Sequence, residues 1–383
     1  MRRQAFIGHD TAAVDEPVVT PRSRAHVVIV TPTLFGAGTG AANHYTHLAR
    51  WLLQRGHDVE VFSEDVAPGW SHPRLRYHGV LPRRTSTGKT GASAYVAYAV
   101  ENARLPGVLC GLSKVSADVI VVHSAIANRP LATKRVFERL WRSSRATLVL
   151  DVRDVLSKRG VLSAASVCDV VASCGAAVDN MLADMHVPAA KVFRLGVAHT
   201  TPRVEDADVA RVCQAFALSR PYVIYTGMLK PSKGVDRLCA AFDRLVATRP
   251  ELAVELVLVG HLKSASPRFL RALERPHIRR LPAQDTTTIM GLVAGSRLHV
   301  NPSRSESFGR STLEALALGV PCIAPAGVPE FAHLGPRFVA AEDVAQLAEQ
   351  IAAQLDRPAV VPYDVSAHEP HAVFAPLSER VGL

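Results

Sequence analysis

Hydrophobic residues in the N-terminal half of the chain form short continuous runs, separated by longer segments in which apolar residues recur at helical spacing. The runs cover residues 26–30, 59–62, 118–122, 146–150, 167–172 and 192–195. Continuous apolar runs of this length are typical of strands that are buried on both faces. Residues 43–55 and 131–145 have helical spacing, and Gly56 stands where a helix end favours a left-handed residue. The alternation predicts a doubly wound parallel sheet.

The same pattern restarts after residues 201–219, which are polar at first and then helical. Strand-like runs and helical segments alternate at residues 222–225, 234–247, 255–259, 298–300, 311–318 and 321–324. Two α/β series of similar length predict two Rossmann-like domains that face each other across a cleft, which is the GT-B architecture. The expected organisation is a flexible leader at 1–24, domains at 25–198 and 199–361, and a tail at 362–383 that packs back on the first domain.

The composition is that of an ordinary globular protein and excludes several classes. The chain has 383 residues, of which 48% are hydrophobic and 20% charged, so bulk disorder is excluded. No apolar run reaches the ~20 residues of a bilayer span, and no apolar stretch follows Arg2 and Arg3 as a secretory signal would require. Six cysteines without a C-x-x-C pair and 16 histidines without zinc spacing predict no metal site and a reducing, cytoplasmic environment.

Charge is divided unevenly between the two halves. Lys and Arg exceed Asp and Glu by nine in residues 1–197 and by one in residues 198–383, which gives the net charge of +10. Part of the excess lies on the predicted helix, as Lys134, Arg135, Arg139, Arg142 and Arg145. This helix either covers the sheet with a solvated face or lies on an anionic membrane surface. Aromatic residues make up only 6% of the chain and form no stripe among the cations, so we expect no nucleic-acid partner.

A glycine-rich loop follows the first predicted strand. Gly36-x-Gly38-x-x-Ala41 matches the dinucleotide-binding fingerprint, and Glu64 stands roughly where a ribose ligand would lie. However, five residues separate the strand from Gly36, whereas a pyrophosphate-binding turn follows its strand at once. An NAD-dependent oxidoreductase is one interpretation and a purely structural turn is another. In a third interpretation, the glycines let backbone N–H groups at the start of a helix approach a bound anion.

The segment 306–314, with the sequence ESFGRSTLE, carries two carboxylates eight positions apart. If a helix begins near Ser311, Glu306 lies in the preceding loop and Glu314 falls one turn inside the helix, so both can line one cleft. The N–H groups between them form a helix N-terminus, which suits a diphosphate. In the ordinary interpretation, one of these glutamates caps the helix and the other is exposed to solvent. This interpretation does not suit Glu314, because its neighbours in the sequence are apolar.

These residues resemble the signature of the retaining GT-B glycosyltransferases of family four, or glycosyl transferases group 1. The similar segments are HVNPSRSESFG at 299–309, EALALGVP at 314–321, GTG at 38–40, RGHDV at 55–59, GMLKPSKGVD at 227–236, LVLVG at 256–260 and GVPE at 327–330. The resemblance covers roughly residues 25–360. It implies transfer of a sugar from a nucleoside diphosphate sugar to an acceptor hydroxyl, with retention of the anomeric configuration and without a metal ion or cofactor.

The resemblance also implies roles for individual residues. Glu306 would hold the hydroxyls of the donor sugar, Glu314 would bind the ribose hydroxyls, and Lys233 would neutralise charge on the leaving group. His123 matches a family histidine near the reacting sugar, with a helix-capping or core histidine as the alternative. The donor-binding residues are then Gly38, Gly40, Gly227, Lys230, Ser307, Phe308, Gly309, Arg310, Ser311 and Glu314.

Three departures from the family pattern affect the donor site. Met228 stands where the family usually has an arginine, and methionine cannot bind a diphosphate in fork geometry. Lys230 or Arg310 is expected to substitute for it. Residues 260–263 lack the usual shorter turn, and residues 195–199 lack the usual polar neighbours of their glycine. The departures leave a catalytically impaired GT-B-like binding protein as an alternative function.

For the substrates, we expect a UDP-sugar ahead of a GDP- or ADP-sugar as the donor. The acceptor would be a glycan, a lipid-linked molecule or a small metabolite. Because members of this family bind the acceptor on the N-terminal domain, the excess positive charge lies on the acceptor side. It therefore favours an acceptor that is anionic or presented at a membrane.

Overall fold

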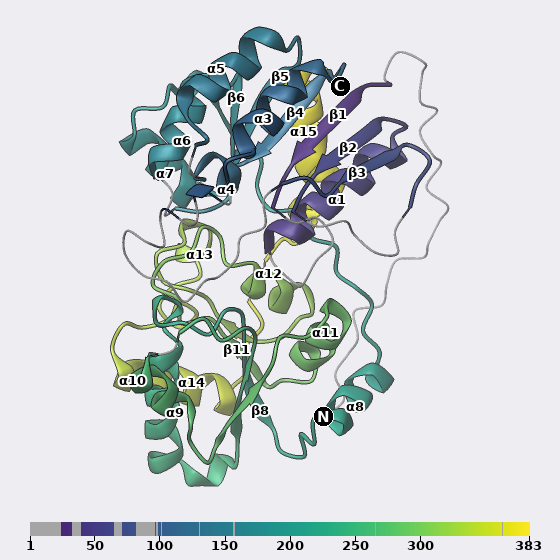
Figure 1. Cartoon of the computed structure of the whole chain (residues 1–383). Coiled ribbons are helices and arrows are strands. Elements are labelled where there is room, and N and C mark those ends of the chain that lie inside the picture. Colours follow the sequence, from purple (N-terminus) through teal and green to yellow (C-terminus); the bar gives the residue numbers. More distant parts are fainter. Residues whose placement is uncertain are drawn as a thin grey trace.

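The chain folds into two α/β domains, each built on one parallel sheet, as the computed structural model in Figure 1 shows. The structure describes residues 24–32, 40–64, 71–81, 96, 99–100, 102–129, 131–155, 158–264, 266–361 and 363–383. The predicted leader up to residue 23 and Gly38 lie outside these residues. The two sheets with alternating helices confirm the predicted GT-B architecture.

The N-terminal domain contains a seven-stranded parallel sheet in the order β3-β2-β1-β4-β5-β6-β7. Its strands are β1 (His26–Val30), β2 (Asp58–Phe62), β3 (Leu75–His78), β4 (Val119–His123), β5 (Thr147–Val152), β6 (Val170–Ser173) and β7 (Val192–Arg194). Its helices include α1 (Gly40–Gln54), α3 (Leu105–Gly111), α4 (Ser124–Ala127), α5 (Lys134–Ser143), α6 (Lys158–Ala165) and α7 (Ala176–Asp184). The central strands β1, β4 and β5 are buried on both faces, as their apolar runs require.

The C-terminal domain contains a five-stranded parallel sheet in the order β10-β9-β8-β11-β12. Its strands are β8 (Tyr222–Thr226), β9 (Glu255–Val259), β10 (Ile278–Leu281), β11 (Leu298–Val300) and β12 (Cys322–Ile323). Its helices include α8 (Asp206–Ala215), α9 (Val235–Thr248), α10 (Pro267–Leu273), α11 (Thr286–Ala294), α12 (Arg310–Ala317), α13 (Pro329–Ala332) and α14 (Val344–Asp356). The strand order reverses between β8 and β11, and ligands of such sheets bind outside the carboxyl ends of the strands at that point.

Two strands that the sequence pattern did not predict lie at sheet edges. β3 has the sequence LRYH and β10 has the sequence IRRL, so neither shows a continuous apolar run. An edge strand is partly solvated, which lets it carry cations that a central strand would exclude. The predicted helix ends are in place, because Gly56 and Gly319 have φ values of 84° and 66°.

Two chain segments cross between the domains, and we call residues 195–199 the hinge segment. The His199 N–H donates to the carbonyl of His368 at 2.7 Å, and His368 Nδ1 donates to the carbonyl of Val197 at 2.9 Å. After this second crossing, helix α15 (Pro370–Val381) lies among the N-terminal elements in Figure 1. There Phe374 is fully buried with its ring centroid 5.9 Å from that of Trp51.

Candidate active site

An ion pair lies in front of helix α12 in the C-terminal domain. Lys233 Nζ is 2.6 Å from Glu306 Oε1, and the Ser303 hydroxyl donates to the same oxygen at 2.9 Å. Both charged side chains are about five-sixths buried, with 17% and 15% of their surface exposed. Residues 73 positions apart therefore meet at the start of α12, where backbone N–H groups are free to bind an anion.

The loop that carries Lys233 follows β8 and depends on a glycine. Gly234 adopts the left-handed conformation with φ of 66°, and a side chain there would collide with the carbonyl of Pro302. A second close approach lies beside it, because a side chain at Gly260 would meet the carbonyl of Gly227. These contacts hold the loop after β8 against the loop before α12 and against the end of β9.

Glu314 lies inside the first turns of α12, as predicted, and it is buried. Burial raises the pKa of its carboxyl group to about 7, and the charge of Arg310 opposes that rise. The acid therefore changes its ionisation near neutral pH, which is far above the ordinary range of a glutamate. Ser311 is at the same helix start, within 3.4 Å of the side-chain nitrogen of the buried Asn301.

Met228 points away from the protein, with 42% of its surface exposed. Its carbonyl accepts a hydrogen bond from the Tyr225 hydroxyl at 3.1 Å. Beside it, a cavity of about 350 Å³ opens at the carboxyl ends of β9 and β10, lined by Gly260, His261, Leu262, Arg280, Leu281, Pro282 and Ala283. The cavity contains no acidic side chain, so its polar lining consists of backbone groups, an imidazole and one guanidinium.

His123 ends β4 on the N-terminal side, and its two nitrogens have different environments. Nδ1 accepts a hydrogen bond from the N–H of Ala125 at 2.7 Å, which caps helix α4. Nε2 is buried and has no hydrogen-bond partner among the described residues. Burial lowers the pKa of His123 to about 3, so the ring is neutral. The helix-capping alternative is thus present in the structure, whereas the second nitrogen is left without a hydrogen-bond partner among the described residues.

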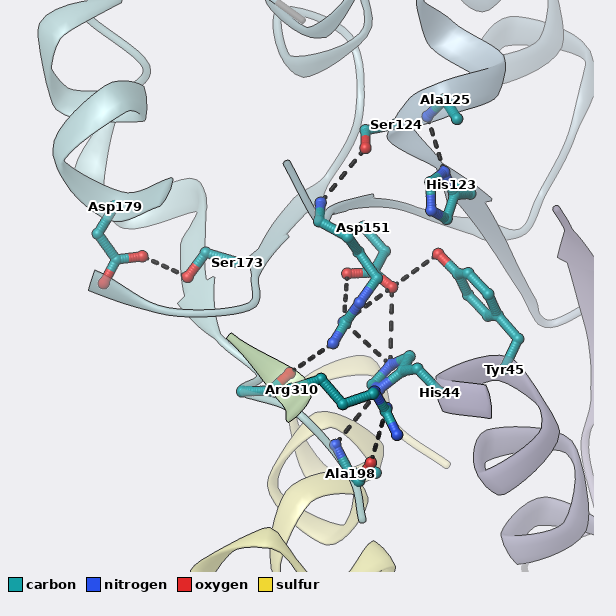
Figure 2. A network of polar contacts seen from close by, with 12 residues as sticks. His44, Tyr45, His123, Ser124, Ala125, Asp151, Ser173, Asp179, Ala198 and Arg310 are labelled. Carbon is teal, nitrogen blue, oxygen red and sulfur yellow. Dashed lines mark hydrogen bonds and ion pairs between the residues drawn. The ribbon is translucent and has the colours of Figure 1, made fainter. Parts of the chain in front are cut away.

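A buried polar network that the sequence did not predict lies beside His123 (Figure 2). Tyr45 Oη donates to Asp151 Oδ2 at 2.7 Å, and Arg153 Nη1 donates to Asp151 Oδ1 at 3.1 Å. Arg153 Nη1 also lies 3.1 Å from Nε2 of His44, whose side chain is fully buried. Asp151 and Arg153 stand at the end of β5, so the rule that polar residues after parallel strands gather at one edge could have found them.

Two side chains of the C-terminal domain reach across to the N-terminal domain. Arg310 Nη2 donates to the carbonyl of Ala198 in the hinge segment at 2.9 Å. Glu330 Oε1 accepts a hydrogen bond from the N–H of Ala176 at the start of α7, at 2.6 Å. Phe308 packs against Phe331 beside this contact, with a centroid distance of 5.6 Å.

The predicted site residues are divided between the two domains of the structure. Residues of the C-terminal group gather around the start of α12 and the loop after β8: Gly227, Lys230, Lys233, Glu306, Ser307, Phe308, Gly309, Arg310, Ser311 and Glu314. His123 lies on the facing domain, and Gly40 begins α1 there. Within the described ranges, no group of three or more His, Cys, Asp or Glu side chains is placed to hold a metal ion. Nor is any helix there both long and apolar enough to cross a membrane.

Comparison with known proteins agrees with this geometry. Residues 220–357 match the model of the family described as Glycosyl transferases group 1. The D-inositol 3-phosphate glycosyltransferase of Jonesia denitrificans is 24% identical in an alignment of 346 positions that covers 78% of this chain and 79% of that protein. HepE of Anabaena, solved with UDP and glucose, covers 94% of this chain and 96% of its own at 16% identity, with a TM-score of 0.65.

A third similar protein is the UDP-forming α,α-trehalose-phosphate synthase of Burkholderia xenovorans, solved in complex with glucose-6-phosphate. It covers 94% of this chain and all of its own at 11% identity, with a TM-score of 0.72. Likeness at this identity concerns the fold, whereas the matched family model covers the segment that holds Lys233, Glu306 and Glu314. On these grounds residues 220–357 resemble the glycosyl transferases group 1 family, and the chain has the GT-B fold.

Proposed function

We propose that this glycosyltransferase moves a hexosyl group from a nucleoside diphosphate sugar to an acceptor hydroxyl, with retention of configuration and without a metal ion. The observation that carries the proposal is the Lys233–Glu306 pair at the free N–H groups of α12, one turn from the buried Glu314. This arrangement offers a cation and a helix N-terminus to a diphosphate and two carboxylates to hydroxyl groups.

In the proposed reaction, negative charge grows on the diphosphate as the bond to the sugar breaks, through an oxocarbenium-like transition state. Lys233 and the N–H groups of α12 stabilise that charge, because they are already oriented in a largely buried site. Glu306 orients the sugar hydroxyls, and the leaving phosphate accepts the proton of the attacking hydroxyl on the same face. We assign to His123, which is neutral and whose Nε2 has no hydrogen-bond partner among the described residues, a place near the sugar on the other domain, as the family resemblance implies.

A UDP-sugar is the donor that we propose. HepE was solved with UDP and glucose, and the cavity beside Met228 lies where the base would extend from the diphosphate. Backbone N–H groups and a guanidinium can donate hydrogen bonds to the carbonyl oxygens of uracil. Guanine, by contrast, usually needs a carboxylate that accepts hydrogen bonds from its N–H groups. A thermal-shift panel with UDP-, GDP- and ADP-glucose tests the choice, followed by mass analysis of products. We expect stabilisation by the uridine nucleotide, and stabilisation by none of the three would refute nucleotide-sugar binding.

The affinity for the donor is expected to depend on pH through Glu314. Its ionised carboxylate accepts the ribose hydroxyls better than the protonated acid, and the pKa of about 7 divides the two forms near neutrality. The Kd of UDP should therefore rise about tenfold per pH unit below pH 6 and level off above pH 8. Titration calorimetry from pH 5.5 to 9 measures this. Glu314→Gln is the matched control and should bind weakly with a flat profile; an equally steep profile in that variant would assign the titration elsewhere.

We further propose that the acceptor carries negative charge. The excess cations belong to the N-terminal half of the chain, and the relative from Jonesia denitrificans is named for an acceptor that bears a phosphate. A phosphorylated polyol or sugar is therefore the first acceptor class to test in product analysis. A neutral glycan that is glycosylated equally well would remove the link between charge and acceptor.

The proposal extends to an anionic membrane as the place where the acceptor is met. Phe137 and Leu140 of α5 are fully buried in the hydrophobic core, while the cations of the helix and Trp141 are exposed. We expect salt-sensitive co-sedimentation with phosphatidylglycerol vesicles, lost when Arg135, Arg139 and Arg142 are replaced by glutamate. If the protein does not bind these vesicles at low salt, the membrane proposal is refuted and α5 has a packing role only.

Two other functions fit the residues less well. A non-catalytic binding protein is favoured by Met228, and sugar transfer or hydrolysis in a coupled assay would exclude it. An NAD-dependent oxidoreductase would rest on the loop from Gly36 to Gly40, which lies outside the described residues before position 40, and it would leave the Lys233–Glu306 pair without a role.

A further inference from the structure

Arg310 is a cation that the proposed reaction has not yet employed. It is the first residue of α12, and its side chain reaches toward Ala198 and His44 of the N-terminal domain (Figure 2). There Nη2 donates to the carbonyl of Ala198 at 2.9 Å. Among the described residues no carboxylate forms an ion pair with it within 4.0 Å. A guanidinium with five N–H donors is thus held mainly by one backbone oxygen.

The ionisable groups around Arg310 come from both domains. Those whose charge interacts with it are His44, His47, His199, His368, Arg153 and Glu314. The histidines are neutral because burial lowers their pKa values, and Arg153 is already paired with Asp151. Glu314, four residues later on the same helix, is therefore the one opposite charge that acts on Arg310 in this group.

We propose that Arg310 is a positioning residue that couples Glu314, the carboxylate proposed to bind the nucleotide, to the hinge segment. The hydrogen bond to the Ala198 carbonyl fixes the guanidinium, and its charge favours the ionised form of Glu314, four residues later on the same helix. The inference rests on the proposed donor role of Glu314. It assigns Arg310 no direct contact with the diphosphate, which leaves Lys230 and the helix N-terminus to compensate for Met228. It also ties the donor site to the hinge segment, so the helix that holds the nucleotide is fixed to the acceptor domain.

The test follows UDP binding from pH 5.5 to 9 in the wild type, Arg310→Met and Arg310→Lys. Methionine preserves the length of the side chain but removes its charge, so Glu314 should ionise at higher pH. A shift of one pH unit in the midpoint would weaken UDP binding about fivefold at pH 7 and leave it unchanged at pH 9. Arg310→Lys keeps the charge and should retain the wild-type midpoint. A merely structural loss would weaken binding equally at every pH.

The double variant completes the design. In the Glu314→Gln background, Arg310→Met should have no further effect on the pH profile, because the group that Arg310 acts on is gone. Thermal melting checks that each variant is folded. Equal weakening of UDP binding by Arg310→Met at all pH values would overturn the inference, because a structural role or a direct contact with the diphosphate would both give that result. An unchanged profile would overturn it as well. Failure of the wild type to bind UDP would instead refute the proposed donor, before any variant is measured.

Discussion

Replacing Lys233 or Glu306 by alanine is expected to reduce turnover of a UDP-sugar by about 100- to 1000-fold, the loss typical for one preorganised charge in a buried site. In the proposed reaction, Lys233→Ala removes the cation that neutralises the leaving diphosphate. We therefore expect kcat to fall by a larger factor than KM rises. Glu306→Ala removes the partner that orients both the sugar and the lysine. Initial rates at saturating donor measure the effect.

The pair also provides the controls for this experiment. Each single variant leaves the partner's charge unpaired in a largely buried site, so some loss of stability is expected, and thermal melting checks that both variants are folded at the assay temperature. Lys114→Ala removes an exposed lysine of the N-terminal domain and should leave turnover unchanged. Wild-type rates in both site variants would show that the reaction takes place elsewhere in the molecule.

Acid is expected to unfold the protein between about pH 6 and pH 4. His44, His123 and His299 are fully or almost fully buried, and burial lowers their pKa values, to about 3 for His123 and His299. The unfolded chain protonates them near pH 6.5, so the free energy of unfolding falls by about 1.4 kcal/mol per histidine and pH unit below that value. Above pH 6.5 the penalty is absent.

Glu314 has the opposite effect from these histidines on the free energy of unfolding as the pH falls. Its pKa is about 7 in the fold and 4.5 in the unfolded chain, so the folded state binds one proton more between those values. For three histidines and one opposing glutamate, the free energy of unfolding falls by about 3 kcal/mol per pH unit below pH 6.5, or by about 5 kcal/mol at pH 4.5. A typical domain has a stability of about 5–15 kcal/mol. Near-ultraviolet circular dichroism along a pH series reports the transition.

His299 offers the sharpest variant for the acid experiment. Within the described structure, both of its ring nitrogens are buried in strand β11 without hydrogen-bond partners. His299→Leu should therefore raise stability at neutral pH and shift the acid transition to lower pH. His333→Leu, at an exposed histidine, is the matched control and should leave the transition in place. Equal shifts in both variants would contradict the role of burial.

The strands of both sheets were predictable to within one to three residues because central parallel strands are buried on both faces. The edge strands β3 and β10 were not, since a solvated edge tolerates the arginines of LRYH and IRRL. Several helices were not predicted either, among them α7, α11, α14 and α15. Of these, α15 begins with a proline and has Pro376 in its interior.

The candidate site was predictable where residues lie close in sequence and not where the fold brings them together. Glu306 and Glu314 share one segment, so helical spacing alone indicated their relation. The family resemblance assigned Lys233 and Glu306 to one donor site, but it did not predict the ion pair between them. The reach of Arg310 to Ala198 had no sequence signal, because it depends on how two separately folded layers meet.

The return of α15 to the N-terminal domain sets an order of events during protein synthesis. The last strand of that domain, β7, is complete at Arg194, but the helix that buries Trp51 begins about 175 residues later. At about 5–20 residues per second, the ribosome needs roughly 9 to 35 s for this distance. During that interval α1 has an uncovered apolar face that chaperones can bind, while the second domain emerges with all of its strands and can close first.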